Sequence, residues 1–221
     1  MQLYSPVELD QLEQESSYLT ETIEWIKNTL AKPHPDLGRV GPVCPFMPRA
    51  LELSAIRLTV IRAKNLQQQQ LEDIVRGYRD IFLDIEPREG EAALYKALLL
   101  IFPDVHIEDT FKFIDAVQQK LKPFFVEAGL MIGEFHKHNE CPGLHNPNFR
   151  PLRSPIPMLA IRFMVESDLP FLQRESDDLR LRIKYLEAYL QRLGKVAKNE
   201  TKLNNARKAL ALAREQLEQE S

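Results

Sequence analysis

The N-terminal part of the chain has the pattern of a helix followed by a proline-rich break. Apolar residues recur at mostly helical spacing from Leu9 to Leu30, which predicts one long helix. Ser5, Pro6 and Glu8 form a sequence that typically begins a helix, because serine caps free N–H groups and proline suits the first helical position. The prolines within Lys32–Pro35 predict its end, since each lacks an N–H and restricts its predecessor.

The middle of the chain alternates between loop, strand and helix patterns. Gly38–Pro48 is rich in glycine and proline, which predicts an irregular ordered loop. Leu51–Arg62 alternates apolar and polar residues, as a strand with one solvent-facing side does. Gln67–Ile85 returns to helical spacing. The apolar run Ala97–Phe102 fits a buried strand, which its length favours, although a core helix remains an alternative.

Two further strands follow another helix. Ile107–Glu127 is amphipathic and predicts a helix, with Pro123 expected to kink or shorten the last turn. Gly129 is a plausible C-terminal cap for that helix. Leu130–Phe135 and Pro157–Val165 are strand-like. The sheet is therefore expected to contain about four strands.

The C-terminal segment is patterned differently from the rest. Apolar residues, mostly leucines, repeat at steps of three and four from Leu179 to Leu193 and again from Leu203 to Leu217, which is the heptad pattern of coiled coils. Gly194 and Asn199 separate the stripes, so a helical hairpin and one long helix are both open. These helices pack either within the chain or in a homodimer.

Taken together, the pattern predicts an α+β fold with a mixed sheet flanked by helices, an N-terminal helix and a C-terminal helical appendage. We expect an α+β domain over residues 1–166 and the appendage over residues 167–221.

Composition excludes several classes of protein. The 221 residues are 44% hydrophobic and 28% charged, with a net charge of −3, so a folded core is expected and neither nucleic acid nor an anionic membrane is an expected partner. No apolar run approaches the roughly 18–20 residues of a membrane helix, and no targeting signal is evident. We expect a soluble, cytoplasmic protein in which Cys44 and Cys141 are free thiols.

The segment between the last two predicted strands carries the most distinctive polar residues. His136, His138, Cys141 and His145 lie within ten residues, and imidazole and thiolate are preferred ligands of zinc and related metals. Their spacing matches no standard zinc module. Three readings stay open: a full zinc site, a site that uses one or two of these residues, or purely structural loop residues. Glu134 next to His136 could serve as a catalytic base with its orienting partner.

Other residues in the two loops could bind a cofactor or an anion. Cys44 precedes a proline, and thiolate is an axial haem ligand; the alternative is a small thiol packed beside Phe46. Arg39, Arg150 and Arg153 could hold a small anionic substrate through bidentate contacts. Alternatively, these arginines pair with acidic residues or carbonyl groups of the loops.

Three motifs carry a resemblance to a known family. GRVGPVCPF at residues 38–46, GEFH at 133–136 and PLRSPIPMLAIR at 151–162 resemble an uncharacterised bacterial family, defined only as a domain of unknown function, over roughly residues 20–175. More remotely, the loop around Cys44 before an α+β core is similar to the YqcI/YcgG-like family, some members of which are haem-dependent N-oxygenases. That resemblance implies haem at Cys44 or His136.

Our leading functional expectation is a small-molecule enzyme or cofactor-binding domain. Its pocket would lie between loops 38–48 and 136–157, and its ligand would be a small anionic or amine-containing molecule. The resemblance implies a haem-dependent oxidoreductase acting on an amine or amino acid, and whether the chain is an enzyme stays open. The alternative is a non-catalytic ligand- or partner-binding module that dimerises through its C-terminal helices.

Overall fold

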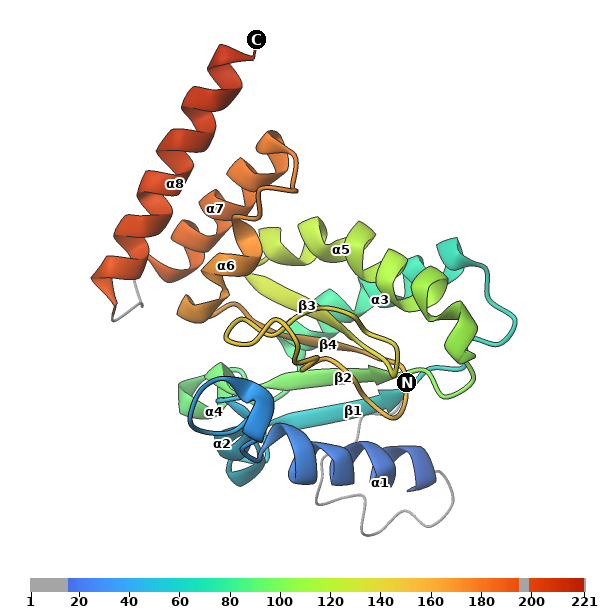
Figure 1. The fold of residues 1–221 in the computed structure, drawn as a ribbon. Helices are drawn as coiled ribbons and strands as arrows, with labels where there is room; N and C mark the ends of the chain where they lie inside the picture. Colours follow the sequence, from blue (N-terminus) through green and yellow to red (C-terminus); the bar gives the residue numbers. More distant parts are fainter. Residues whose placement is uncertain (1–15, 195–198, 221) are drawn as a thin grey trace. The chain divides into compact units, whose positions relative to one another are not determined.

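The computed structural model describes residues 16–194 and 199–220, which form two compact units (Figure 1). The first unit contains the described residues up to Lys120 together with Ile132–Arg162. The second contains Leu121–Met131 together with the described residues from Phe163 onward. The predicted cap at Ser5–Glu8 lies outside the described residues. Sequence periodicity did not predict that Leu121–Met131 would join the C-terminal helices.

Helical segments precede, separate and follow the strands. They are α1 (Ser16–Trp25), η2 (Ile26–Leu30), η3 (Pro35–Leu37), α2 (Met47–Glu52), α3 (Gln68–Asp84), α4 (Gly90–Leu94), η4 (Ile107–Asp109), η5 (Phe111–Asp115), α5 (Ala116–Glu127), η6 (Glu166–Asp168), α6 (Leu169–Leu172), α7 (Leu179–Leu193) and α8 (Glu200–Gln219). Segments η2 and η5 are π-helical, and η3, η4 and η6 are 3₁₀ turns.

The four strands form one mixed sheet, as the sequence predicts. They are β1 (Ile56–Val60), β2 (Ala97–Ile101), β3 (Leu130–Phe135) and β4 (Met158–Phe163), in the order β1-β2-β4-β3. Strands β1 and β2 pair in parallel, and β2 pairs antiparallel with β4. The apolar run at β2 is therefore a strand and not a core helix. All five of its residues are buried, as expected for a strand covered on both faces.

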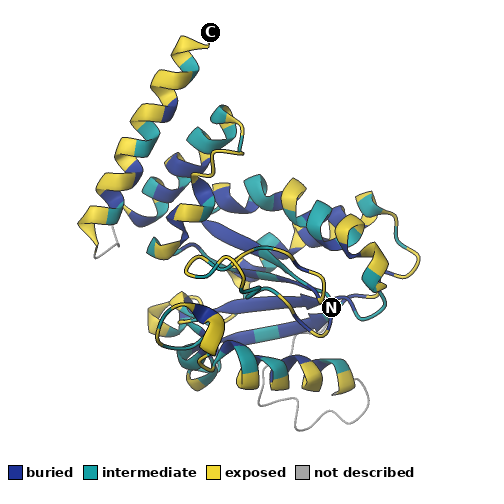
Figure 2. Cartoon of the chain, in the orientation of Figure 1, coloured by how far each residue is buried: buried dark blue, intermediate teal, exposed yellow. Residues whose placement is uncertain are grey.

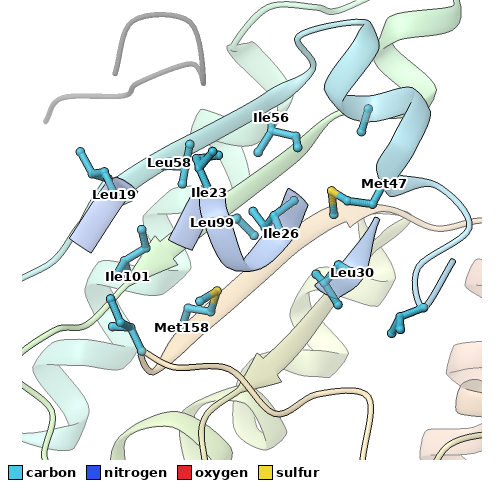
Figure 3. Packing of buried hydrophobic residues seen from close by; sticks show 13 residues of the cluster. Leu19, Ile23, Ile26, Leu30, Met47, Ile56, Leu58, Leu99, Ile101 and Met158 are labelled. Atoms are coloured by element: carbon cyan, nitrogen blue, oxygen red, sulfur yellow. The ribbon is translucent and has the colours of Figure 1, made fainter. Parts of the chain in front are cut away.

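One face of the sheet packs against the N-terminal helix (Figure 3). Alternate strand residues point to this face, and they meet the apolar side of α1 and η2. We call this group the α1-side cluster; its buried members are Leu19, Ile23, Ile26, Leu30, Val43, Met47, Ala50, Ile56, Leu58, Leu99, Ile101, Ile156 and Met158. The intervening residues Leu98, Leu100, Leu159 and Ile161 are also buried (Figure 2). Their side chains therefore cover the opposite face of the sheet.

A buried lysine fastens the end of α3 to the beginning of β2. The Lys96 side chain is buried, its Nζ donates to the carbonyl of Ile85 at 2.8 Å, and the amine lies 4.7 Å from the centre of the Phe82 ring. Burial lowers the pKa of Lys96. A cation at a helix C-terminus satisfies carbonyls that have no partner within the helix.

Two local predictions from the sequence are wrong. The strand expected over Leu51–Arg62 begins only at Ile56, because α2 continues to Glu52 and Ser54 turns the chain with a φ of 50°. The alternation before Ile56 is too short to outweigh the packing of Leu51 against the α1-side cluster. Pro123 also does not shorten α5, which continues to Glu127 because buried residues after the proline keep the last turn packed; a kink at Pro123 stays a prediction.

The C-terminal helices form a hairpin within the second unit. Helix α7 contacts α8, and their buried residues join those of α6 and of the 121–131 segment in a second cluster: Val126, Met131, Met164, Leu169, Leu172, Tyr185, Leu186, Tyr189, Leu193, Leu203 and Ala206. Within this cluster the Tyr189 hydroxyl donates to the Glu166 carbonyl at 2.9 Å. Burial raises the pKa of Tyr189 to about 12.

Among the helices that the structure describes, every one falls short of the length and hydropathy that crossing a membrane requires.

The hairpin can be tested with two leucines of α8. Leu203 is 2% exposed, whereas Leu212 is 55% exposed. Leu203→Ala should lower the free energy of unfolding by about 2–5 kcal/mol, because it leaves a cavity between the helices. Leu212→Ala should change it by no more than about 0.5 kcal/mol. Urea denaturation, at concentrations where the chain is monomeric, measures both. Equal losses would contradict the packing described here.

Candidate functional site

The most chemically distinctive arrangement in the described residues is a buried histidine paired with an aspartate. His136 is the first residue after β3 and is fully buried. Its Nε2 lies 2.9 Å from Oδ1 of Asp115, whose side chain is 18% exposed. The preceding Phe135 packs on the α1-side cluster, with its ring 5.8 Å from that of Trp25. Since neighbouring strand residues point to opposite faces, His136 lies on the face away from α1.

Both neighbours of the His136 ring come from the π-helical segment η5. Asp115 ends this segment, and Phe111 begins it. The Phe111 ring meets the imidazole edge to face, with 5.9 Å between ring centroids, yet Phe111 is 60% exposed. Single π turns occur frequently at functional sites. The sequence analysis did not identify Asp115 or Phe111.

The second nitrogen of the His136 ring, Nδ1, has no hydrogen-bond partner among the described residues. This atom is also buried. In the tautomer in which Nε2 donates to Asp115, the lone pair of a neutral ring is on Nδ1. A buried polar atom without a partner costs about 1–3 kcal/mol. This nitrogen is therefore available as a base or as a ligand, at a cost in stability.

The four predicted metal ligands do not assemble into one set. His136 is engaged with Asp115, whereas His138 and His145 are exposed. The backbone N–H of Cys141 donates to the Asn139 side chain at 2.9 Å. Within residues 16–194 and 199–220, no group of three or more His, Cys, Asp or Glu residues is placed to hold a metal ion. The structure thus gives no support to the full zinc site, and a site that uses one or two of these residues stays a prediction.

Glu134 shares the strand face of His136 by its position two residues earlier. It is partly buried, and its backbone carbonyl lies 3.5 Å from the amide nitrogen of Asn139. Its role as a base stays a prediction.

Cys44 lies on the other side of the sheet from His136. It is partly buried against the α1-side cluster, and its N–H donates to the Leu30 carbonyl at 2.8 Å. The structure therefore does not bring Cys44 and His136 together. Each could serve as a ligand only in a site of its own.

The loop after β3 contacts residues 34–38, which lead into the first predicted loop. The amide of Asn146 donates to the Asp36 carbonyl at 2.7 Å, and the rings of His34 and Phe149 lie 4.7 Å apart. At Gly38, φ is 77°, and an added Cβ would lie 2.5 Å from the carbonyl oxygen of His145. Glycine is required at this position both for the backbone conformation and for the close approach.

The three candidate arginines are all engaged by groups of their own loops. Arg39 donates to the carbonyls of Val40 and Val43, at 3.1 and 3.0 Å. Arg150 and Arg153 both bind the carboxylate of Glu140. Hydrogen bonds from Arg150, and then from Arg153, lower the pKa of Glu140. The structure thus shows the pairing with acidic residues and carbonyls that the sequence left open.

Comparison with known proteins identifies a family without a known activity. A family model described as a domain of unknown function (DUF6875) matches residues 19–204, so the chain belongs to this family. The match extends beyond the roughly 155 residues of the resemblance noted in the sequence and takes in the beginning of α8. No curated protein and no solved structure matches the chain.

The contact between the loops can be tested with three glycines. Gly90 also has a positive φ, of 76°, but has open space around it, so Gly90→Ala should cost only the strain of about 1–2 kcal/mol. Gly38→Ala should cost about 1–3 kcal/mol more, because its Cβ meets the His145 backbone. Gly77 lies in the middle of α3 with open space around it, so Gly77→Ala should raise the free energy of unfolding by about 0.5–1 kcal/mol. Equal losses at Gly38 and Gly90, measured by urea denaturation, would show that the loops do not touch.

Proposed function

We propose that this member of the family is a small-molecule enzyme or cofactor-binding domain whose site lies at the end of β3. The observation that supports the proposal is the buried His136, held through Nε2 by Asp115 and left without a partner at Nδ1. A purely structural histidine would gain by pairing both nitrogens, because each unpaired buried atom lowers stability.

The chemistry of the site follows from the position of the proton. Asp115 would orient the ring and hold the proton on Nε2, as carboxylate partners of ligating histidines do. Nδ1 then either accepts a proton from a substrate or donates its lone pair to a metal centre. In both roles Asp115 is a positioning residue, and His136 is the residue that touches the reacting group.

A ligand must displace something to reach Nδ1, since this atom is buried. Phe111 is the natural candidate, because its ring lies against the imidazole and is itself 60% exposed. Rotation of an exposed aromatic side chain is far less costly than opening the core. We include this movement of Phe111 in the proposal.

The specific form of the proposal is a haem-dependent oxidoreductase acting on an amine or amino acid. An imidazole nitrogen without a partner, with a carboxylate on the other ring nitrogen, fits the donor set of an axial ligand. His136 would hold the haem, and haem would supply the oxidative chemistry. Cys44 is the second possible ligand, in a separate site on the other side of the sheet.

Haemin titration followed by visible absorption tests this form. His136→Ala should abolish saturable binding, and Asp115→Asn should weaken it by about 10–100-fold. His138→Ala is the matched control, because His138 is exposed two residues further on, and it should bind like the wild type. Phe111→Ala should bind faster. Wild-type binding in His136→Ala with loss in Cys44→Ala would identify Cys44 as the ligand. Retention in both variants would reject both residues as haem ligands, and no saturable binding to the wild type would eliminate haem.

An exposed leucine favours a second candidate function. Leu212 is 55% exposed on α8, whereas Leu203 and Ala206 of the same helix are buried in the hairpin. A partner helix would cover such a residue. In this alternative the chain is a non-catalytic binding module that dimerises through its C-terminal helices.

Light scattering of the full chain separates the alternatives. If the dimer forms, the wild type should have twice the mass of the chain, and Leu212→Glu should have the mass of one chain. Leu94 is similarly exposed in the first unit, so Leu94→Glu is the matched control and should leave the mass unchanged. A monomeric wild type would reject dimerisation.

A further inference from the structure

Two arginines of the loop after β3 hold one carboxylate between them. Arg150 Nε lies 3.1 Å from Oε2 of Glu140, and Arg153 Nη2 donates to Oε1 of the same side chain. Each carboxylate oxygen thus has its own guanidinium. This is the donor arrangement that proteins use to recognise carboxylates.

Both guanidinium groups are also anchored to the backbone. Arg150 Nη1 donates to the Pro147 carbonyl at 2.6 Å, and Arg153 Nε donates to the Asn139 carbonyl at 3.1 Å. These carbonyls do not depend on the Glu140 side chain for their positions. The two arginines are therefore preorganised to bind an anion, with part of the entropy cost already met by the loop.

The Glu140 side chain itself is held only weakly at this position. It is 63% exposed, and the side chain of Arg153 is 49% exposed. Exposed ion pairs contribute little to stability, because water competes for both charges. A dissolved carboxylate can replace Glu140 at little cost to the fold.

Asn139 connects this arginine pair to the end of β3. It is 4% exposed, and its N–H donates to the His136 carbonyl at 3.1 Å while its own carbonyl accepts from Arg153. Asn139 thus links the two sites: its N–H binds the backbone of His136, and its carbonyl positions the guanidinium of Arg153.

We infer that Arg150 and Arg153 form a binding site for a small-molecule carboxylate, in which Glu140 is a built-in competitor. The incoming carboxylate takes the two guanidinium contacts and Glu140 turns outward to water. Binding of a carboxylate here stands by itself; that it orients a substrate for His136 rests on the proposed function. An amino acid would supply both the carboxylate and the amine of that proposal.

Acetate is the probe, and the Nε–H resonances of the arginines in ¹⁵N-labelled full-length chain are the readout. Glu140→Ala should bind acetate saturably and at least about tenfold more tightly than the wild type, because the competitor is gone. Sodium chloride at equal ionic strength should not reproduce the shifts. Arg153→Ala in the Glu140→Ala background should lose the saturable response.

The matched control is an arginine held mainly by carboxylates. Arg49 binds Glu91 and Glu52, and Glu91→Ala should not create a saturable acetate site there. Equal acetate affinity in wild type and Glu140→Ala, or equal shifts with chloride, would overturn the inference.

His136→Ala combined with Glu140→Ala separates this inference from the proposed function. Acetate should still bind this double variant. Acetate binding together with unaltered haemin binding in His136→Ala would retain the arginine site and reject the histidine site.

Discussion

The alternation of side chains at the end of β3 governs where chemistry can occur in this domain. Phe135 enters the α1-side cluster, and the next residue, His136, is therefore directed to the opposite face, where Asp115 meets it. Cys44 packs on the same cluster as Phe135. This backbone constraint thus separates Cys44 from His136, and of the two only His136, which is itself buried, has a carboxylate partner.

The burial of these groups is the reason that the proposed function is centred on His136 and not on the charged loop residues. The Glu140 carboxylate between Arg150 and Arg153 is exposed, so water competes for its contacts and a ligand can replace them. The Nδ1 of His136 is instead buried without a hydrogen-bond partner among the described residues, and an unpaired buried polar atom lowers stability. A feature that lowers stability needs an explanation beyond the fold, whereas an exposed ion pair does not.

The sheet could be predicted from the sequence because the apolar run at β2 is explained by burial on both faces. The histidine could also be found, from its residue type and its place after a strand. Its partner could not be predicted, because Asp115 lies 21 residues earlier. At that position, helical periodicity makes Asp115 one of many polar residues of an amphipathic helix. The π turn that brings Asp115 and Phe111 to the same ring changes the helical register, and a period of 3.6 residues carries no signal of it. An acidic residue among FKFI, next to the buried Ile114, was the one available hint.

The segment after β3 shows why structural and binding roles need not compete. A connection of this length, without helix or strand, pairs some of its backbone groups with one another and needs side chains for others. Asn139, Arg150 and Arg153 supply them, and Gly38 lets the neighbouring loop approach. The same hydrogen bonds that order the segment also fix two guanidinium groups in place. A charged side chain fixed by the backbone has little more entropy to lose when a ligand arrives, so the order of this loop is itself a reason to expect binding there.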